Sequence, residues 1–144
     1  MKENLIISAC LLGTPCRYDG KSVKKVDITL LNKKYNLIPV CPEIYGGLST
    51  PRIPSERQGE RVVMRNGTDV TENFKAGAEA ALSFAEINGC KRALLKAKSP
   101  SCAKGEIYDG SFSGTLTAGN GVAAELLMAR GISVFTEDEI EKLL

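Results

Sequence analysis

Short runs of strand-forming residues alternate with helical patterns along the 144 residues, and this alternation most limits the folds open to the chain. Strands separated by helices are typical of an α/β domain whose sheet is largely parallel. We therefore predict a single α/β domain over residues 1–144, with a mostly parallel sheet flanked by helices and a β-hairpin insertion.

The predicted elements follow from hydrophobic periodicity and from turn and capping residues. Four apolar runs predict strands: Leu5–Cys10, Asn36–Val40, Arg92–Ala97 and Ile132–Phe135. Helices are predicted over four ranges: Asp27–Tyr35, Glu72–Asn88, Val122–Arg130 and Thr136–Leu144, the last with Thr136 and Glu139 as a capping box. The dipeptide Asn66-Gly67 predicts a hairpin over Arg61–Thr71. Proline and glycine predict loops over Pro42–Gly59 and Lys104–Gly121.

The helix over Glu72–Asn88 has the clearest apolar stripe. Its members recur at helical spacing: Phe74, Gly77, Ala78, Ala81, Leu82 and Ala85. Because several of these residues are small, we expect this helix to pack closely against the sheet.

Composition and charge exclude several classes of protein. Nineteen basic and seventeen acidic residues leave a net charge of +2, which is not the strongly basic balance of a nucleic-acid binder. No run of about 18 apolar residues is present to span a membrane, and no charged and apolar leader precedes the first strand. We expect a soluble cytoplasmic protein with no nucleic-acid partner and no membrane partner. No heptad or interface stripe indicates an oligomeric state.

The chain contains no histidine and five cysteines. The lack of histidine excludes the Ser-His-Asp triad, the Cys-His pair and zinc sites with histidine ligands. An odd number of cysteines, in a chain of ordinary length with no leader, argues against a secreted disulfide framework. The thiols are therefore core residues, nucleophiles or metal ligands.

Three cysteines follow predicted strands. Cys10 ends the first strand, Cys41 follows the second, and Cys102 lies a few residues beyond the third. Ligands of an open parallel sheet bind at the carboxyl ends of the strands, so we expect these thiols at one functional edge. Considered singly, each of these cysteines can also be a small buried core residue, and this role suits Cys90, beside a helix end, best. Cys16 shares the loop of Cys10 and is a possible fourth ligand.

Three thiolates at one edge suit more than one metal centre. An all-cysteine zinc site and an iron–sulfur cluster both use soft thiolate ligands, and the residues alone leave both open. With three cysteines, one iron of a cluster has no protein ligand and is free to bind a substrate atom.

Polar residues of the same loops are candidates for catalysis and substrate binding. Glu43 and Asp19 are candidate general acids or bases, although a solvated loop position or a helix cap accounts better for Asp19. Arg17 and Arg52 carry paired donors that suit an anionic or carbonyl oxygen. Ser99 and Ser101, on either side of Pro100, are candidates to hydrogen-bond a ligand and also fit a simple Ser-Pro turn.

Six motifs occur together along nearly the whole chain. They are ISACLLG from Ile7, CRYDG from Cys16, CPE from Cys41 with GGL from Gly46, PR from Pro51, SPSC from Ser99 and IYDG from Ile107. Together they resemble the domain-of-unknown-function family 523 (DUF523), which includes thiouracil desulfidase, an iron–sulfur enzyme.

This resemblance implies a [4Fe–4S] cluster held by Cys10, Cys41 and Cys102, with Cys16 as a secondary candidate. It also implies that the free iron takes sulfur from a thiocarbonyl while the carbon gains oxygen from water, without net redox change. Our leading hypothesis is a desulfidase for a small thiolated heterocycle such as a thiopyrimidine.

In this hypothesis the catalytic residues are Glu43, which activates water, and Ser101, which lies beside a ligand. The substrate-binding residues are predicted to be Arg17, Arg52, Ser99 and Asp19. Two alternatives are a non-enzymatic module that binds zinc or an iron–sulfur cluster, and a small-molecule binder with unligated thiols.

Overall fold

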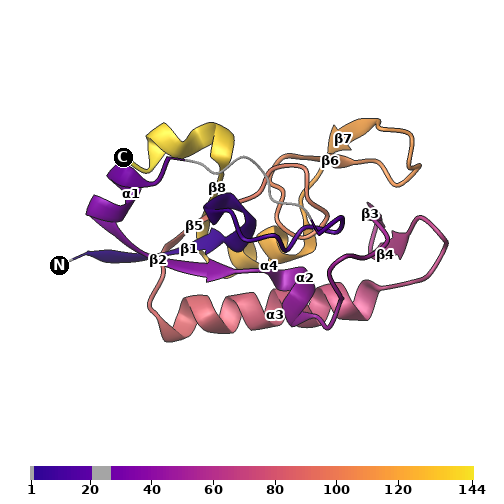
Figure 1. Ribbon diagram of the computed structural model, residues 1–144, viewed down its shortest axis with the longest axis horizontal. Helices are drawn as coiled ribbons and strands as arrows, with labels where there is room; N and C mark the ends of the chain where they lie inside the picture. The colour runs from indigo at the N-terminus through magenta and orange to yellow at the C-terminus, as the bar shows by residue number, and fades with distance from the viewer. Residues whose placement is uncertain (1, 21–26) are drawn as a thin grey trace.

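The computed structural model describes residues 2–20 and 27–144 and is built around a four-stranded parallel sheet (Figure 1). The strand order is β2-β1-β5-β8. These strands are β1 (Glu3–Ser8), β2 (Tyr35–Val40), β5 (Arg92–Leu95) and β8 (Ser133–Thr136). The predicted α/β class with a mostly parallel sheet is confirmed.

Helices cover both faces of the sheet, so the central strands have continuous apolar runs, Leu5–Ile7 in β1 and Ala93–Leu95 in β5 (Figure 1). On one face, α3 (Thr71–Ile87) and α4 (Val122–Ala129) pack against a core that includes Ile6 of β1. On the other face lie α1 (Thr29–Lys34) and a C-terminal 3₁₀-helix (Glu137–Lys142), over a core that includes Leu5 and Ile7. None of the helices in the described ranges has the length and apolar character needed to cross a membrane.

The predicted stripe of α3 is buried along its whole length, which confirms its orientation. One residue of that stripe, Gly77, lets the short helix α2 (Pro42–Tyr45) pack closely against α3. A Cβ atom on Gly77 would lie 1.8 Å from the carbonyl oxygen of Pro42, closer than any real contact. This close approach seats α2, and with it the segment that carries Cys41 and Glu43, directly on α3.

Several element boundaries differ from the predictions. The first strand ends at Ser8, and Cys10 lies two residues further on, in a 3₁₀-helix (Ala9–Leu12). Tyr35 begins β2 rather than ending α1, because α1 stops after Lys34. The last predicted helix is a 3₁₀-helix, and its predicted capping box is present.

The hairpin prediction was wrong about its partner strand. β3 (Ser55–Gln58) pairs with β4 (Arg61–Met64), so part of the predicted 42–59 loop supplies one strand. Asn66-Gly67 does form a tight turn, in which the Met64 N–H donates to the Thr68 carbonyl at 2.8 Å. An isolated bridge between Val63 and Asp69 follows that turn in place of the expected strand.

The predicted loop 104–121 also contains a hairpin. Its strands are β6 (Glu106–Tyr108) and β7 (Leu116–Ala118), which pair antiparallel. Strands of three residues are too short to show the two-residue alternation by which a strand is recognised in a sequence.

The capping box at the start of the C-terminal 3₁₀-helix predicts a pH dependence of stability. Burial by itself raises the pKa of Glu139, but hydrogen bonds from Lys142, the Thr136 N–H and Lys104 outweigh it and lower this pKa from 4.5 to about 2. A carboxyl group with a lowered pKa stabilises the fold above its unfolded value, and this stabilisation is lost as the pH falls from about 4.5 toward 2.

We therefore expect Glu139→Gln to lower the free energy of unfolding by about 1 kcal/mol near neutral pH, the size of a typical cap. Urea unfolding of both proteins between pH 6 and pH 2.5 measures this difference. The two proteins should converge in stability at the acid end, and an equal difference at every pH would contradict the assignment.

Candidate active site

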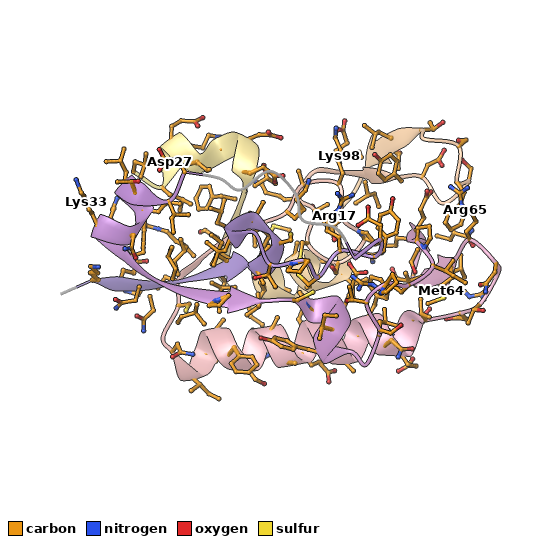
Figure 2. All side chains as sticks on the ribbon, in the orientation of Figure 1. Arg17, Asp27, Lys33, Met64, Arg65 and Lys98 are labelled. Carbon is orange, nitrogen blue, oxygen red and sulfur yellow. The ribbon has the colours of Figure 1, made fainter. Side chains whose placement is uncertain are left out.

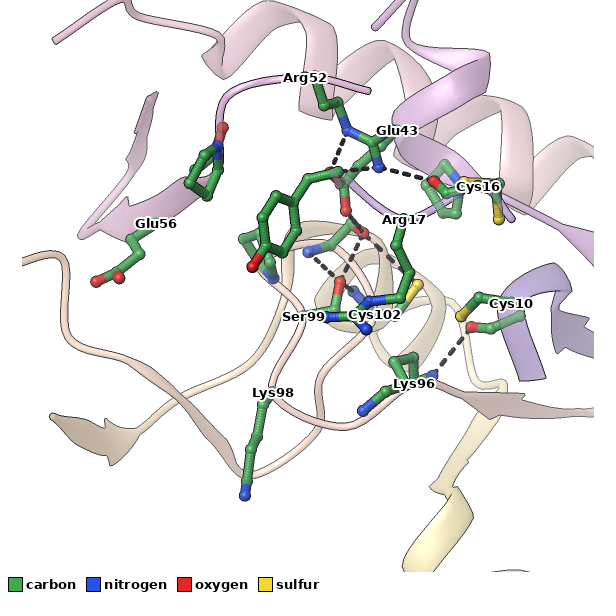
Figure 3. Close-up of a pocket in the computed structure, with 18 of the residues that line it drawn as sticks. Cys10, Cys16, Arg17, Glu43, Arg52, Glu56, Lys96, Lys98, Ser99 and Cys102 are labelled. Atoms are coloured by element: carbon green, nitrogen blue, oxygen red, sulfur yellow. Dashed lines mark hydrogen bonds and ion pairs between the residues drawn. The ribbon is translucent and has the colours of Figure 1, made fainter. Parts of the chain in front are cut away.

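A cavity of about 400 Å³ lies beyond the carboxyl ends of β1, β2 and β5. Four thiols line it: Cys10, Cys16, Cys41 and Cys102. Figure 3 shows three of them, those of Cys10, Cys16 and Cys102, in the same part of the cavity wall. The structure thus brings together the three predicted ligands and the possible fourth, whereas Cys90 is buried in the core between α3, α4 and the sheet, as predicted.

Each thiol reaches the cavity from a differently built turn. Cys10 is held in the 3₁₀-helix after β1, which ends at Gly13 with a φ of 93°. Cys41 is extended between β2 and α2, where Pro42 occupies the first helical turn as proline prefers. Cys102 follows β5 and is buried.

The loop 99–103 is held by hydrogen bonds from two directions. The Ser99 hydroxyl oxygen accepts the N–H groups of Ser101 and Cys102, each at 3.1 Å. The first turn of α4 donates to the same loop, with the Ala123 N–H 2.8 Å from the Ser101 carbonyl oxygen. The Ser-Pro-Ser-Cys segment is therefore fixed in position, and this fixes the Cys102 thiol.

The surroundings of the thiols oppose their ionisation when no metal is bound. Burial raises the pKa of Cys102 to about 11. A hydrogen bond with Cys16, and then burial, raise the pKa of Cys41 well above its ordinary range. The pKa of Cys16 is also raised, first by its hydrogen bond with the Cys10 thiol. Because metal ligation requires thiolates, a metal centre here would displace thiol protons and supply the positive charge that stabilises the sulfurs.

The four thiols lie along the cavity wall, and Cys16 interacts with two of the others, Cys10 and Cys41. Among residues 2–20 and 27–144, no three His, Cys, Asp or Glu side chains are grouped closely enough to hold a metal ion. The wall nevertheless supplies four cysteine sulfurs, and cysteine thiolates are the ligands that iron–sulfur clusters take from proteins.

Glu43, Arg52 and Ser101 form a connected network beside the thiols (Figure 3). The Glu43 carboxylate accepts from the Arg52 Nε at 3.1 Å through Oε1 and from the Ser101 hydroxyl at 3.0 Å through Oε2. The Ser101 hydroxyl oxygen also lies 3.6 Å from the Cys102 sulfur. One hydroxyl thus joins a carboxylate to a thiol that we expect to bind metal.

The Arg52 guanidinium is nearly enclosed, with 4% of its side chain exposed. Besides Glu43, it donates to the carbonyl oxygens of Cys16 and Ser49 and to the Thr50 hydroxyl, each at 3.1 Å. Its described contacts are therefore with the chain itself, and a contact with substrate stays a prediction. Arg52 therefore orients the Glu43 carboxylate and links the loop of Cys16 to Glu43 through its own side chain.

The other predicted binding residues differ in their access to the cavity. Ser99 lines it, and its hydroxyl lies 3.0 Å from that of Ser101. Arg17 also lines it, 3.9 Å from the Asp19 carboxylate, whereas Asp19 is not among the lining residues that the structure describes. Asp19 is thus placed to orient Arg17 rather than to face the cavity.

Several residues that line the cavity were not predicted from the sequence. Three are cations, Lys96, Lys98 and Arg65, and others are Tyr18, Glu56, Tyr108 and Phe112. In Figure 2, Arg17, Arg65 and Lys98 lie in the half of the molecule opposite Lys33. Tyr18 and Tyr108 belong to the CRYDG and IYDG motifs, so these motifs could have identified them as site residues. Glu56 lies in β3 and Arg65 directly follows β4, the hairpin whose pairing was predicted wrongly.

Known proteins are similar to this chain over nearly its full length. The solved structure described as the [4Fe–4S]-dependent thiouracil desulfidase TudS (DUF523Vcz) is 49% identical to this chain, with a TM-score of 0.93. The match covers 99% of this chain and 95% of that one. The uncharacterised protein YbbK of Bacillus subtilis (strain 168) is 37% identical over 150 residues, which cover 97% of this chain and 99% of YbbK.

A sequence model of a known family also matches the chain, from the first strand to the C-terminal 3₁₀-helix. The matched residues are 5–139 and include all four thiols of the cavity as well as Glu43, Arg52 and Ser101. With this match and a similar fold over nearly its full length, the chain belongs to the 2-thiouracil desulfurase family.

Proposed function

We propose that the protein is a [4Fe–4S]-dependent desulfidase that removes sulfur from a small thiolated heterocycle resembling thiouracil and releases sulfide. The observation that carries the proposal is the position of Ser101. Its hydroxyl lies 3.0 Å from the Glu43 carboxylate and 3.6 Å from the Cys102 sulfur, in the cavity that the other thiols also line. A group that can move protons therefore adjoins the thiols best placed to hold a cluster.

The proposed cluster ligands are Cys10, Cys41 and Cys102. They come from three separate segments, and each lines the same cavity. Cys16 remains a possible further ligand, since its thiol lines the same cavity and influences the titration of its neighbour Cys41. When bound through three cysteines, the cluster supplies an iron without a protein ligand, which acts as a Lewis acid toward the sulfur of the substrate.

The reaction that we propose is a hydrolysis. Water adds its oxygen to the thiocarbonyl carbon, the carbon–sulfur bond breaks, and sulfur leaves as hydrogen sulfide with the two protons of the water. Atoms balance and no electrons are exchanged. The chain must therefore accept a proton from water at one stage and return it at another, which is general acid–base catalysis.

Glu43 is the proposed general base. Its Oε1 is held by Arg52, so its Oε2 is directed toward Ser101 and the cavity. The Ser101 hydroxyl has a single proton, and the carboxylate is a stronger acceptor than the Cys102 sulfur 3.6 Å away. Ser101 therefore donates to Glu43, and Ser99 donates in turn to Ser101 across 3.0 Å. This chain of donors keeps the carboxylate in one orientation.

Substrate binding is proposed for Arg17 and Ser99, which line the cavity, with Asp19 orienting Arg17. Arg17 is partly exposed, with 35% of its side chain accessible, so it has freedom to turn toward a ring oxygen. For Arg52 we propose a positioning role through Glu43. The cytoplasm is the proposed compartment, because all five cysteines are free and reduced thiols persist there.

Iron and acid-labile sulfide, measured per chain on protein purified without oxygen, test this proposal. We expect about four of each, a broad brown absorbance, and release of sulfide from 2-thiouracil. Zinc without labile sulfide would favour the alternative binding module. Protein that takes up no cluster even after incubation with iron and sulfide would overturn the proposal.

A further inference from the structure

The loop between β6 and β7, residues 109–115, presents one large apolar side chain at the cavity. Its sequence is Asp-Gly-Ser-Phe-Ser-Gly-Thr, in which Phe112 is the only large residue. The Phe112 side chain lines the cavity and is half-buried. It has no polar group that would account for its position outside the core, unlike the tyrosines that share the cavity.

The backbone at Phe112 adopts a conformation that bulky residues avoid. Its φ is 57°, in the left-handed region. Such a conformation persists only where the surroundings impose it, and it is concentrated at sites of function. The neighbouring contacts show what imposes it here.

Glu56 of β3 holds the 109–115 loop by hydrogen bonds to its backbone. Its Oε1 accepts the Gly110 N–H at 3.0 Å and the Phe112 N–H at 3.2 Å. Gln58 of the same strand donates through Nε2 to the Gly110 carbonyl oxygen at 2.8 Å. A Cβ atom on Gly110 would lie 2.6 Å from the Gln58 Cγ, so only glycine allows this close seating. The β3-β4 hairpin and the 109–115 loop thus form one fixed wall of the cavity.

Arg65 adds a cation to the same aromatic ring. Its guanidinium carbon lies 5.7 Å from the centroid of the Phe112 ring, and both side chains line the cavity. A cation over an aromatic ring restrains the ring and leaves its remaining surface for another flat group.

We propose that Phe112 is a substrate-binding residue on which the planar ring of the substrate stacks, and that Glu56 is the positioning residue that fixes Phe112. The proposal deepens the proposed function, on which it rests, by naming the residues that recognise the planar ring of the substrate. A carbonyl-rich heterocycle has an electron-poor face that suits contact with an aromatic side chain. A thiocarbonyl compound without a ring gains nothing from this wall.

The chain contains no tryptophan, so Phe112→Trp introduces a single fluorescent reporter at the wall. We expect its emission to change saturably when anaerobically purified protein is titrated with uracil, a ring of the product type. Phe84→Trp is the matched control, because Phe84 is a partly exposed aromatic residue on α3 that does not line the cavity. Its emission should not respond. A silent reporter in Phe112→Trp would overturn the proposal, since this readout requires no catalysis.

Calorimetric titration with uracil measures the contribution of each residue. We expect Phe112→Leu to raise the Kd about 10-fold to 100-fold, in the range of single base–aromatic contacts, and Phe112→Tyr to retain most of the affinity. Thiourea, which has a thiocarbonyl but no ring, should discriminate little between Phe112→Leu and the unmodified protein. An unchanged Kd for uracil in Phe112→Leu would contradict the role of Phe112.

The positioning role of Glu56 has its own test. Glu56→Ala should weaken uracil binding, whereas Glu56→Gln keeps an acceptor oxygen and should restore most of it. Combining Glu56→Ala with Phe112→Leu should weaken binding no further than Phe112→Leu alone, because both act through one ring. Additive losses would overturn the positioning role. Ring binding with no sulfide release would contradict the proposed function instead, so the two failures are distinguishable.

Discussion

Replacing Cys41 by alanine is expected to abolish both the brown absorbance of the cluster and the release of sulfide from a thiocarbonyl substrate. Cys41 is one of three proposed ligands, and a cluster already bound by only three thiolates has no surplus protein ligand among them to lose. The substituted side chain is half-buried between β2 and α2, so its loss leaves the sheet intact. Iron and labile sulfide per chain, measured without oxygen beside the activity, check this result.

Cys90→Ala is the matched control for Cys41→Ala. Cys90 is also a poorly exposed cysteine, but it packs with the core between α3, α4 and the sheet and does not line the cavity. This variant should therefore keep the cluster and the activity, with a modest loss of stability from the deleted sulfur. Full activity in Cys41→Ala would contradict the three-cysteine assignment, and so would loss of the cluster in folded Cys90→Ala.

Glu43→Gln is expected to lower kcat by about 10²-fold to 10⁴-fold while the cluster remains bound. Glutamine keeps the size of the side chain and can still accept a hydrogen bond from Ser101, but it cannot accept a proton from water. The visible spectrum and the iron content should match those of the unmodified protein, and the steady-state rate of sulfide release gives the loss.

The Glu43→Gln variant also leaves the enclosed Arg52 guanidinium without its carboxylate, which lowers stability. Glu125→Gln is the matched control, because it removes the carboxylate that pairs with Arg57 and lies outside the cavity. If both variants lose stability but only Glu43→Gln loses activity, the loss reflects chemistry rather than folding. Activity within a few-fold of normal in a stable Glu43→Gln protein would exclude Glu43 as the general base.

Predictions of the elements succeeded where periodicity was long enough to be read. The buried stripe of α3 is one example, because its pattern extends over the whole helix. The apolar run Leu5–Ile7 likewise identified β1, although the strand begins at Glu3 and ends at Ser8. The strands that were not predicted are short: β6 and β7 have three residues each, and β3 consists of the polar residues Ser55–Gln58. A strand of this kind is formed by its partner, so nothing in its own residues identifies it.

The candidate site was predictable in part for the same reason. A thiol that follows a parallel strand must lie near the carboxyl edge of the sheet, so the positions of Cys10, Cys41 and Cys102 in the chain already indicated a shared cavity. Their order in space, β2-β1-β5, depends on crossover connections that the sequence leaves open. The contact of Cys16 with two of these thiols depends on how one loop folds back, which no local pattern encodes.

The sequence by itself determined the fold class, the absence of histidine chemistry and the segments that carry the thiols. Only the tertiary structure decided which side chains meet: Ser101 donates to Glu43 across 58 positions, and Glu56 holds the loop of Phe112 across 56. The physical reason is that periodicity reports the local preference of a segment for a helix or a strand. Contacts between distant segments depend instead on strand register, on loop closure and on close approaches such as that of Gly77 to Pro42, which exist only once the whole chain has packed.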